Sequence, residues 1–203
     1  MTARLFVIAA PSGAGKTSLV QALLEQEPQL RVSVSHTTRR PRLNEQNGRE
    51  YFFVATDEFK AMAAAGEFLE HAQVFDNYYG TGRRQLEQKL AAGFDVILEI
   101  DWQGARQVRA ARPDCVSIFI LPPSREALEQ RLNARRTDTP AVIARRLADA
   151  VTDMSHYAEF DYVVVNDTFQ DTVAQLRRIL HDDGEEFEAG RAALQPVLRN
   201  LLA

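Results

Sequence analysis

The chain has 203 residues, of which 45% are hydrophobic and 26% charged, and its formal net charge is −4. This composition is typical of one soluble domain with a sizeable core, and the acidic balance argues against a protein that coats nucleic acid. No apolar run is long enough to span a bilayer and no secretion signal opens the chain, so we expect a cytoplasmic protein without a membrane partner. The one cysteine, Cys115, excludes an intrachain disulfide and lies in an apolar run that favours a core position.

Short apolar segments alternate with helical segments along most of the chain. The segments rich in β-branched and aromatic residues, which we expect to be strands, are Arg4–Ala10, Arg31–Ser35, Asp95–Ile100, Cys115–Leu121 and Tyr162–Asn166. The expected helices are Lys16–Gln26, Arg83–Ala92, Trp102–Arg112, a pair between Ser124 and Phe160, and Thr168–Asp182. This alternation predicts an α/β fold in which a mainly parallel five-stranded core sheet carries helices on both faces and binds ligands at the carboxyl ends of its strands.

Two segments depart from the alternation. Between Thr37 and Thr81 the sequence predicts turns, short strands at Tyr51–Val54 and Phe68–Phe75, and one short helix that begins at Asp57, which together indicate an inserted subdomain. The tail, Glu185–Leu202, has the pattern of an amphipathic helix that packs on the body or on a neighbouring molecule.

Between the first expected strand and the first expected helix, the chain reads APSGAGKT, the pattern of a Walker A phosphate-binding loop. Its glycines let backbone N–H groups converge on phosphate oxygens, Lys16 adds a positive charge, and the Thr17 hydroxyl suits Mg²⁺. Ala10 stands where the pattern expects its first glycine, which requires a negative φ at that position. A chance glycine-rich turn is the alternative. The candidate ATP-binding loop comprises Ala10, Pro11, Ser12, Gly13, Ala14, Gly15, Lys16 and Thr17.

Two acids mark the end of the third expected strand of the core. Glu99 and Asp101 flank Ile100, so strand alternation places both carboxylates on one face, where they suit nucleotide contacts or water on a metal better than packing. The four histidines are dispersed and give no metal-ligand spacing. Any metal should therefore be Mg²⁺, held at Thr17 and otherwise mostly through phosphates and water.

Five blocks of the sequence resemble the guanylate kinase family, in that family's order and roughly its spacing. They are SHTTRRPRLNEQNGREYFFV, FLEHAQVFDNYYGT, EIDWQG, RLNARRTDTPAVIARRL and VVVND, and the similarity runs from Arg4 to about Asp183. The resemblance implies the reaction ATP + GMP ⇌ ADP + GDP with Mg²⁺, with dGMP as a further acceptor, and it leaves homo-oligomerisation open. It also implies a kinase-like domain at 3–183, with a core of 3–34, 83–123 and 160–183, a GMP-binding insert at 35–82 and a lid at 124–159, before the C-terminal helix at 184–203.

The resemblance assigns the GMP site to residues of the insert and the core. Arg39 and Arg42, with hydroxyl groups from Tyr51 and Tyr79, match the family's grip on the GMP phosphate, and a guanidinium suits a phosphate because it can donate two hydrogen bonds at once. A solvated basic loop is the alternative for the arginines. On the base, the matching residues are Glu70, which would accept from N1–H and N2–H₂, Thr81, which would donate to O6, Ser35 near N2, and Glu99 and Asp101 on the GMP side.

On the ATP side, Arg131, Arg135 and Arg146 match family positions at the phosphates, and Asn166 and Asp167 match the loop beside adenine. Asp167 has the alternative role of capping the following helix. The expected catalytic residues are Lys16, Arg39, Arg135 and Arg146. Surface positions are expected for Arg40, Arg49, Arg136 and Arg145.

Two other functions are compatible with parts of the sequence. A related kinase could phosphorylate another phosphorylated sugar or nucleotide, but the presence of Glu70, Tyr79 and Thr81 argues against it. A guanylate-kinase-like interaction module could bind partners without turnover, but such a module has no need of the complete GAGKT loop at Gly13–Thr17.

Overall fold

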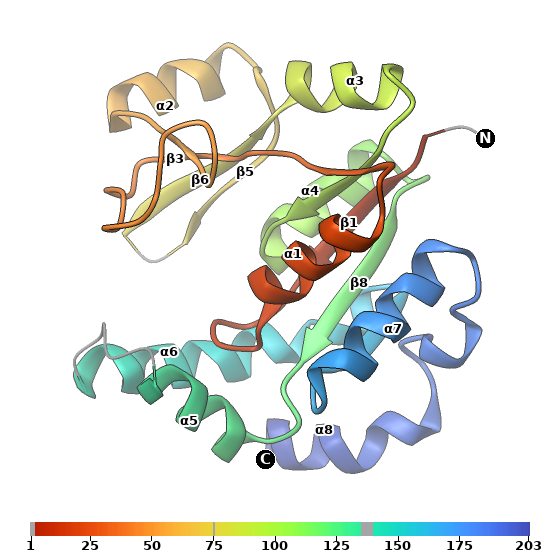
Figure 1. The fold of residues 1–203 in the computed structure, drawn as a ribbon. Coiled ribbons are helices and arrows are strands. Elements are labelled where there is room, and N and C mark those ends of the chain that lie inside the picture. Colours follow the sequence, from red (N-terminus) through yellow and green to blue (C-terminus); the bar gives the residue numbers. More distant parts are fainter. Residues whose placement is uncertain (1–2, 75, 135–139) are drawn as a thin grey trace. The chain divides into compact units, whose positions relative to one another are not determined.

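The computed structural model describes residues 3–74, 76–134 and 140–203. The chain forms two compact units. Figure 1 shows the helices and strands, coloured along the sequence. The first unit combines a segment that ends at Val7 with Gln29–Leu98 and Gln103–Cys115. The second combines Ile8–Pro28, Glu99–Trp102 and Val116–Ala203.

The predicted five-stranded core sheet is present, with the order β2-β7-β1-β8-β9. Its strands are β1 (Leu5–Ala9), β2 (Leu30–Val32), β7 (Asp95–Glu99), β8 (Val116–Leu121) and β9 (Tyr162–Val165). β2 is parallel to β7 and β8 is parallel to β9. Every residue of β1 is buried, as its unbroken apolar run predicts. The expected α/β class is therefore confirmed, although β2 begins and ends earlier than the predicted Arg31–Ser35.

The first unit also contains a smaller sheet of order β4-β3-β6-β5. Its strands are β3 (His36–Thr37), β4 (Phe52–Phe53), β5 (Phe68–Val74) and β6 (Asn77–Gly82). Helix α2 (Thr56–Ala64) packs on β5, where the rings of Phe59 and Phe68 stack with centroids 4.6 Å apart. The predicted short strands and helix of the insert are confirmed, whereas β3 and β6 were not expected. The predicted strand end at Phe75 lies outside the described residues.

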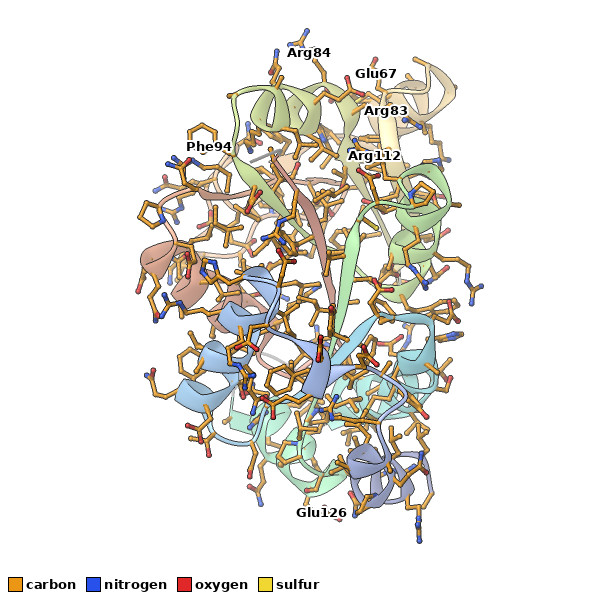
Figure 2. All side chains as sticks on the ribbon, turned by 90° about the vertical axis from the view of Figure 1, so that its right-hand side faces the viewer. Glu67, Arg83, Arg84, Phe94, Arg112 and Glu126 are labelled. Atoms are coloured by element: carbon orange, nitrogen blue, oxygen red, sulfur yellow. The ribbon has the colours of Figure 1, made fainter. Side chains whose placement is uncertain are left out.

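Two helices follow the insert and flank β7 in the sequence: α3 (Arg83–Ala91) and α4 (Trp102–Ala111). Figure 2 labels Arg83 and Arg84 at the exposed start of α3, where the Arg83 N–H donates to the Glu67 carbonyl at 2.9 Å. It also labels Phe94, on whose ring the Arg31 guanidinium lies 4.0 Å from the centroid. These labelled residues of the first unit are exposed or half-buried and lie outside the predicted site.

The second unit is mostly helical outside the sheet. Its helices are α1 (Lys16–Gln26), α5 (Arg125–Ala134), α6 (Pro140–Ser155), α7 (Phe169–Leu180) and α8 (Gln195–Leu202). Figure 1 shows α5 beside α6, and the two helices are in contact. The tail differs from the single helix expected over 184–203, because the 3₁₀ turns η2 (Glu185–Phe187) and η3 (Ala192–Leu194) precede α8. Within the described ranges, no helix is long and apolar enough to cross a membrane.

Candidate functional site

The predicted phosphate-binding loop connects β1 to α1 in the second unit. Gly13 and Gly15 both have φ of +95°, and Gly15 is the N-cap of α1. The Ala14 N–H donates to the Pro11 carbonyl at 3.2 Å and closes a turn. Among the described non-glycine residues only Asp182 has a positive φ, so Ala10 has the ordinary backbone that the sequence requires there. The loop therefore opens toward the first turn of α1 with its glycines where left-handed backbone demands them.

Close packing is a second reason for these glycines. A Cβ on Gly15 would lie 2.5 Å from Asn166 Nδ2, and a Cβ on Gly13 would lie 2.9 Å from Leu128 Cδ1. The buried Asn166 amide donates to the Ala14 carbonyl at 2.7 Å, so it holds the loop from the end of β9. Arg131 Nη2 in turn donates to the Asn166 carbonyl at 2.8 Å, while its Nη1 is buried without a hydrogen-bond partner in the described part of the chain. Arg131 thus lies beside the loop with donor capacity to spare.

Lys16, Thr17 and Glu99 meet at the start of α1. Lys16 Nζ donates to the Ile100 carbonyl at 2.8 Å. Burial raises the pKa of Glu99, while the charge of Lys16 and a hydrogen bond with Thr17 oppose that rise. Glu99 Oε1 is buried and has no hydrogen-bond partner among the described residues. These hydroxyl and carboxylate oxygens are the hard donors that Mg²⁺ and its water prefer. The described chain holds no cluster of three or more His, Cys, Asp or Glu residues that could bind a metal alone.

Two of the residues predicted to read guanine, Glu70 and Thr81, meet in the first unit. Glu70 on β5 pairs in register with Thr81 on β6, and both side chains are buried, with Glu70 only 3% exposed. The Thr81 hydroxyl donates to Glu70 Oε1 at 2.6 Å. Since a hydroxyl carries one proton, donation to Glu70 and donation to guanine O6 exclude each other. Thr81 therefore orients the carboxylate in this structure. Ser35, the residue before β3, is also buried, with 8% of its surface exposed.

The predicted phosphate-gripping side chains also meet in the first unit. The Arg39 guanidinium lies 5.5 Å from the centroid of the Tyr51 ring, and the Tyr51 and Tyr79 rings pack edge to face. Tyr79 also forms a side-chain hydrogen bond with Arg39. Arg42 is more exposed, with 59% of its side chain accessible.

Sequence reasoning missed Glu45, which joins the two arginines. Glu45 Oε1 accepts from Arg39 Nη2 at 2.8 Å, and Oε2 accepts from the Arg42 N–H at 2.8 Å. Burial opposes ionisation of Glu45, but these hydrogen bonds outweigh it and keep its pKa below the usual value. The sequence feature that could have indicated this contact is an acidic residue three positions after Arg42. That spacing suits a turn, and the Glu45 N–H indeed donates to the Arg42 carbonyl.

The other predicted residues differ in their exposure. Asp101 and Arg146 are half-buried, whereas Asp167 is exposed. The alternative role of Asp167 as a helix cap is wrong, because the N-cap of α7 is Thr168, one residue further along. Arg145 is exposed and pairs with Asp149 at 3.9 Å, which fits its predicted surface position. Arg135 and Arg136 lie outside the described residues.

Comparisons with known proteins identify the family of the chain. The family model described as guanylate kinase matches residues 2–183. A guanylate kinase of Alkalilimnicola ehrlichii is 55% identical over 202 residues, covering 100% of both chains, and one of Methylococcus capsulatus is 61% identical over 176 residues, covering 87% of this chain and 86% of the relative.

A solved structure is similar as well. The crystal structure of guanylate kinase from Anaplasma phagocytophilum superimposes with a TM-score of 0.75 at 34% identity, covering 98% of this chain and 94% of that one. The chain belongs to the guanylate kinase family.

Proposed function

We propose that this guanylate kinase transfers the γ-phosphoryl group of ATP to GMP by means of the loop at Ala10–Thr17 and a guanine site built on Glu70. Transfer between two anionic nucleotides demands in-line positioning and charge neutralisation, without a covalent intermediate. Cations and hydroxyl groups are therefore proposed to position and neutralise the phosphates, and a carboxylate is proposed to select the base.

The buried Glu70–Thr81 pair is the observation that carries this proposal. Guanine presents N1–H and N2–H₂ donors, which a carboxylate can accept, whereas adenine presents an acceptor at N1 that would face the carboxylate without a hydrogen bond. Leaving a buried charged group unpaired is costly, so such a site discriminates by about 10⁴ in favourable cases. Ser35, buried in the same unit, is proposed near the N2 edge, with Glu99 and Asp101 on the GMP side.

The phosphates of the two nucleotides are proposed to meet different cations. Arg39 and Arg42, with the hydroxyl groups of Tyr51 and Tyr79, bind the GMP phosphate, and the contacts of Glu45 with both arginines support this grouping. Lys16 neutralises charge on the transferred group. The remaining residues proposed on the ATP side are Arg131, Arg135, Arg146, Asn166 and Asp167.

Mg²⁺ is the proposed metal, and its fit rests on Thr17 and Glu99. Thr17 would hold it through its hydroxyl and Glu99 through bound water, which is supported by the buried Glu99 oxygen without a partner among the described residues. When bound, the ion would neutralise charge on the phosphate oxygens. The division into core, insert at 35–82 and mobile lid at 124–159, turnover of dGMP, and a cytoplasmic location are further proposals that rest on the family.

A coupled assay of ADP release tests the proposal. GMP, dGMP, AMP, CMP, UMP, dTMP and a ribose bisphosphate are offered in turn with ATP and Mg²⁺. Turnover should be high with GMP, lower or equal with dGMP, and far lower with the others. Preference for another acceptor would indicate a related kinase. Binding of GMP without release of ADP would indicate an interaction module and contradict the proposal.

A further inference from the structure

Trp102 connects the segment that carries Asp101 to the end of helix α6, within the second unit. It is the first residue of α4 and directly follows Asp101. Its indole ring stacks on the His156 imidazole with centroids 3.5 Å apart and planes 12° apart. Its Nε1–H donates to Asp153 Oδ1 at 3.2 Å. His156 Nδ1 lies 2.7 Å from Glu159 Oε1, so the cluster continues into the turn η1 (Tyr157–Glu159).

This cluster costs more free energy than an apolar contact would, because it holds a half-buried carboxylate near a second one. Asp153 is half-buried, and burial together with the nearby charge of Asp101 raises its pKa to about 6, against a weaker opposing effect of the Trp102 hydrogen bond. An apolar contact between α4 and α6 would avoid placing two carboxylates near each other. A polar cluster of this kind gains directional hydrogen bonding, which fixes one orientation of the helix.

The face of α6 that Trp102 contacts is also the face that carries Arg146. Asp153 follows Arg146 by seven residues, and seven residues bring an α-helix to within about 20° of two full turns. The two side chains are therefore on one stripe of the helix, about 10 Å apart along its axis. A rotation or slide of α6 at Asp153 would displace Arg146 by a similar amount.

We propose that Trp102 is a positioning residue, which with Asp153 and His156 fixes the C-terminal end of α6 to the Glu99–Trp102 segment and so sets where Arg146 reaches the phosphates. The inference rests on the proposed role of Arg146. Trp102 itself is proposed to touch neither substrate nor metal. Because misplacing a catalytic group by about 1 Å can cost about 100-fold in rate, the cluster should affect turnover more than GMP affinity.

Steady-state kinetics of four variants and one control variant test the inference. Trp102→Phe keeps a ring that can stack but removes the N–H donor, and Asp153→Ala removes the acceptor; each should lower kcat about tenfold and leave KM for GMP within about twofold. Asp153→Asn keeps an acceptor oxygen and should lose less than about threefold. The double variant Trp102→Phe/Asp153→Ala should fall no further than the worse single variant, because both disrupt one bond. Thr152→Ala, exposed on the same helix, is the matched control and should behave as wild type.

Fluorescence provides a readout that is independent of turnover. Trp102 is the only tryptophan in the sequence, so intrinsic emission reports this site alone. Because a stacked imidazole quenches an indole, His156→Ala should raise the emission intensity, and Thr152→Ala should not. Unchanged emission in His156→Ala would overturn the stack and the inference with it.

The kinetic outcomes separate this inference from the proposed function. If Arg146→Ala lowers kcat while Trp102→Phe and Asp153→Ala only lower the melting temperature, the cluster is merely structural and the positioning role is overturned. If Arg146→Ala has no effect on kcat while GMP is still phosphorylated, the role of Arg146 fails and the positioning inference fails with it. If GMP is not phosphorylated by the wild type, the proposed function fails, while the fluorescence result still reports whether the cluster exists.

Discussion

Lys16 is the residue proposed to act most directly on the phosphates. Its ammonium donates to the Ile100 carbonyl at 2.8 Å from the first turn of α1, and its positive charge favours ionisation of the buried Glu99. Lys16→Ala should fold normally and lose at least about 100-fold in kcat, because the charge that it supplies is needed in the transition state. Circular dichroism checks the fold, and the coupled assay checks turnover. Ala10→Gly, at a position of ordinary φ, is the control and should stay within about threefold.

Gly15 is constrained twice, by its backbone and by Asn166. Gly15→Ala should destabilise the protein by about 2–4 kcal/mol, since a left-handed backbone costs about 1–2 kcal/mol and the new methyl would displace the Asn166 amide from the loop. Gly93→Ala is the matched control, with φ of +86° and nothing within 4 Å of its Cβ. Urea unfolding should show a clearly smaller loss for Gly93→Ala. Equal losses would mean that the contact with Asn166 contributes nothing.

The site residues differ in how far sequence could identify them. The loop could be predicted because Gly13, Gly15, Lys16 and Thr17 are adjacent in sequence and each has a physical reason to be there. Glu70 and Thr81 were found only through the family resemblance, since nothing in their own neighbourhood predicts that they face each other across β5 and β6. Pairings between distant residues, such as Trp102 with Asp153, carry no local signal at all.

At the scale of elements, prediction succeeded where the pattern was long and failed where it was short. The helix expected at Lys16–Gln26 has those bounds, and all five core strands are present within a few residues. β3 was missed because two residues cannot show an alternation, and β6 because Asn77–Gly82 is rich in glycine and turn-forming residues. The prediction of a single helix over 184–203 was wrong, because the apolar residues of this segment also fit two 3₁₀ turns before α8.

Helix α6 offers a prediction about pH and stability. The pKa of Asp153 rises from 3.8 to about 6 on folding, mainly through burial and then through the charge of Asp101. The folded state thus binds this proton more tightly, and the resulting stabilisation is complete below pH 3.8 and is lost as the pH rises through about 6. Asp153→Asn cannot ionise, so at pH 7 it should be more stable than wild type by about 1–3 kcal/mol, with solvent screening included.

Urea unfolding at several pH values checks this prediction. The difference in the free energy of unfolding between Asp153→Asn and wild type should grow between pH 4 and pH 7 and then level off. A difference that is independent of pH would show that Asp153 has an ordinary pKa in the folded protein.

At the scale of the whole molecule, the proposed mechanism requires arginines from separate segments to meet across the phosphates. Of the residues proposed for GMP, all but Glu99 and Asp101 belong to the first compact unit, whereas the residues proposed for ATP belong to the second. Because transfer needs both sets of phosphates at one point, both nucleotides together should draw the molecule into a more compact state. Small-angle X-ray scattering with GMP and a non-hydrolysable ATP analogue should give a smaller radius of gyration than the free protein. An unchanged radius with both ligands demonstrably bound would argue against a mobile lid.

The central claim, that a buried carboxylate selects guanine, is tested most directly by Glu70→Gln. The variant keeps the size of the side chain and an oxygen to accept from Thr81, but it turns an N–H₂ donor toward the guanine donors. A hydrogen bond to a charged group contributes about 1.5–3 kcal/mol, so kcat/KM for GMP should fall about 10- to 200-fold, while turnover of AMP should be unchanged or rise. Arg39→Ala is the control and should weaken all monophosphates alike, since a phosphate contact carries no information about the base. If Glu70→Gln leaves the preference for GMP over AMP unchanged, guanine is read elsewhere and the claim is contradicted.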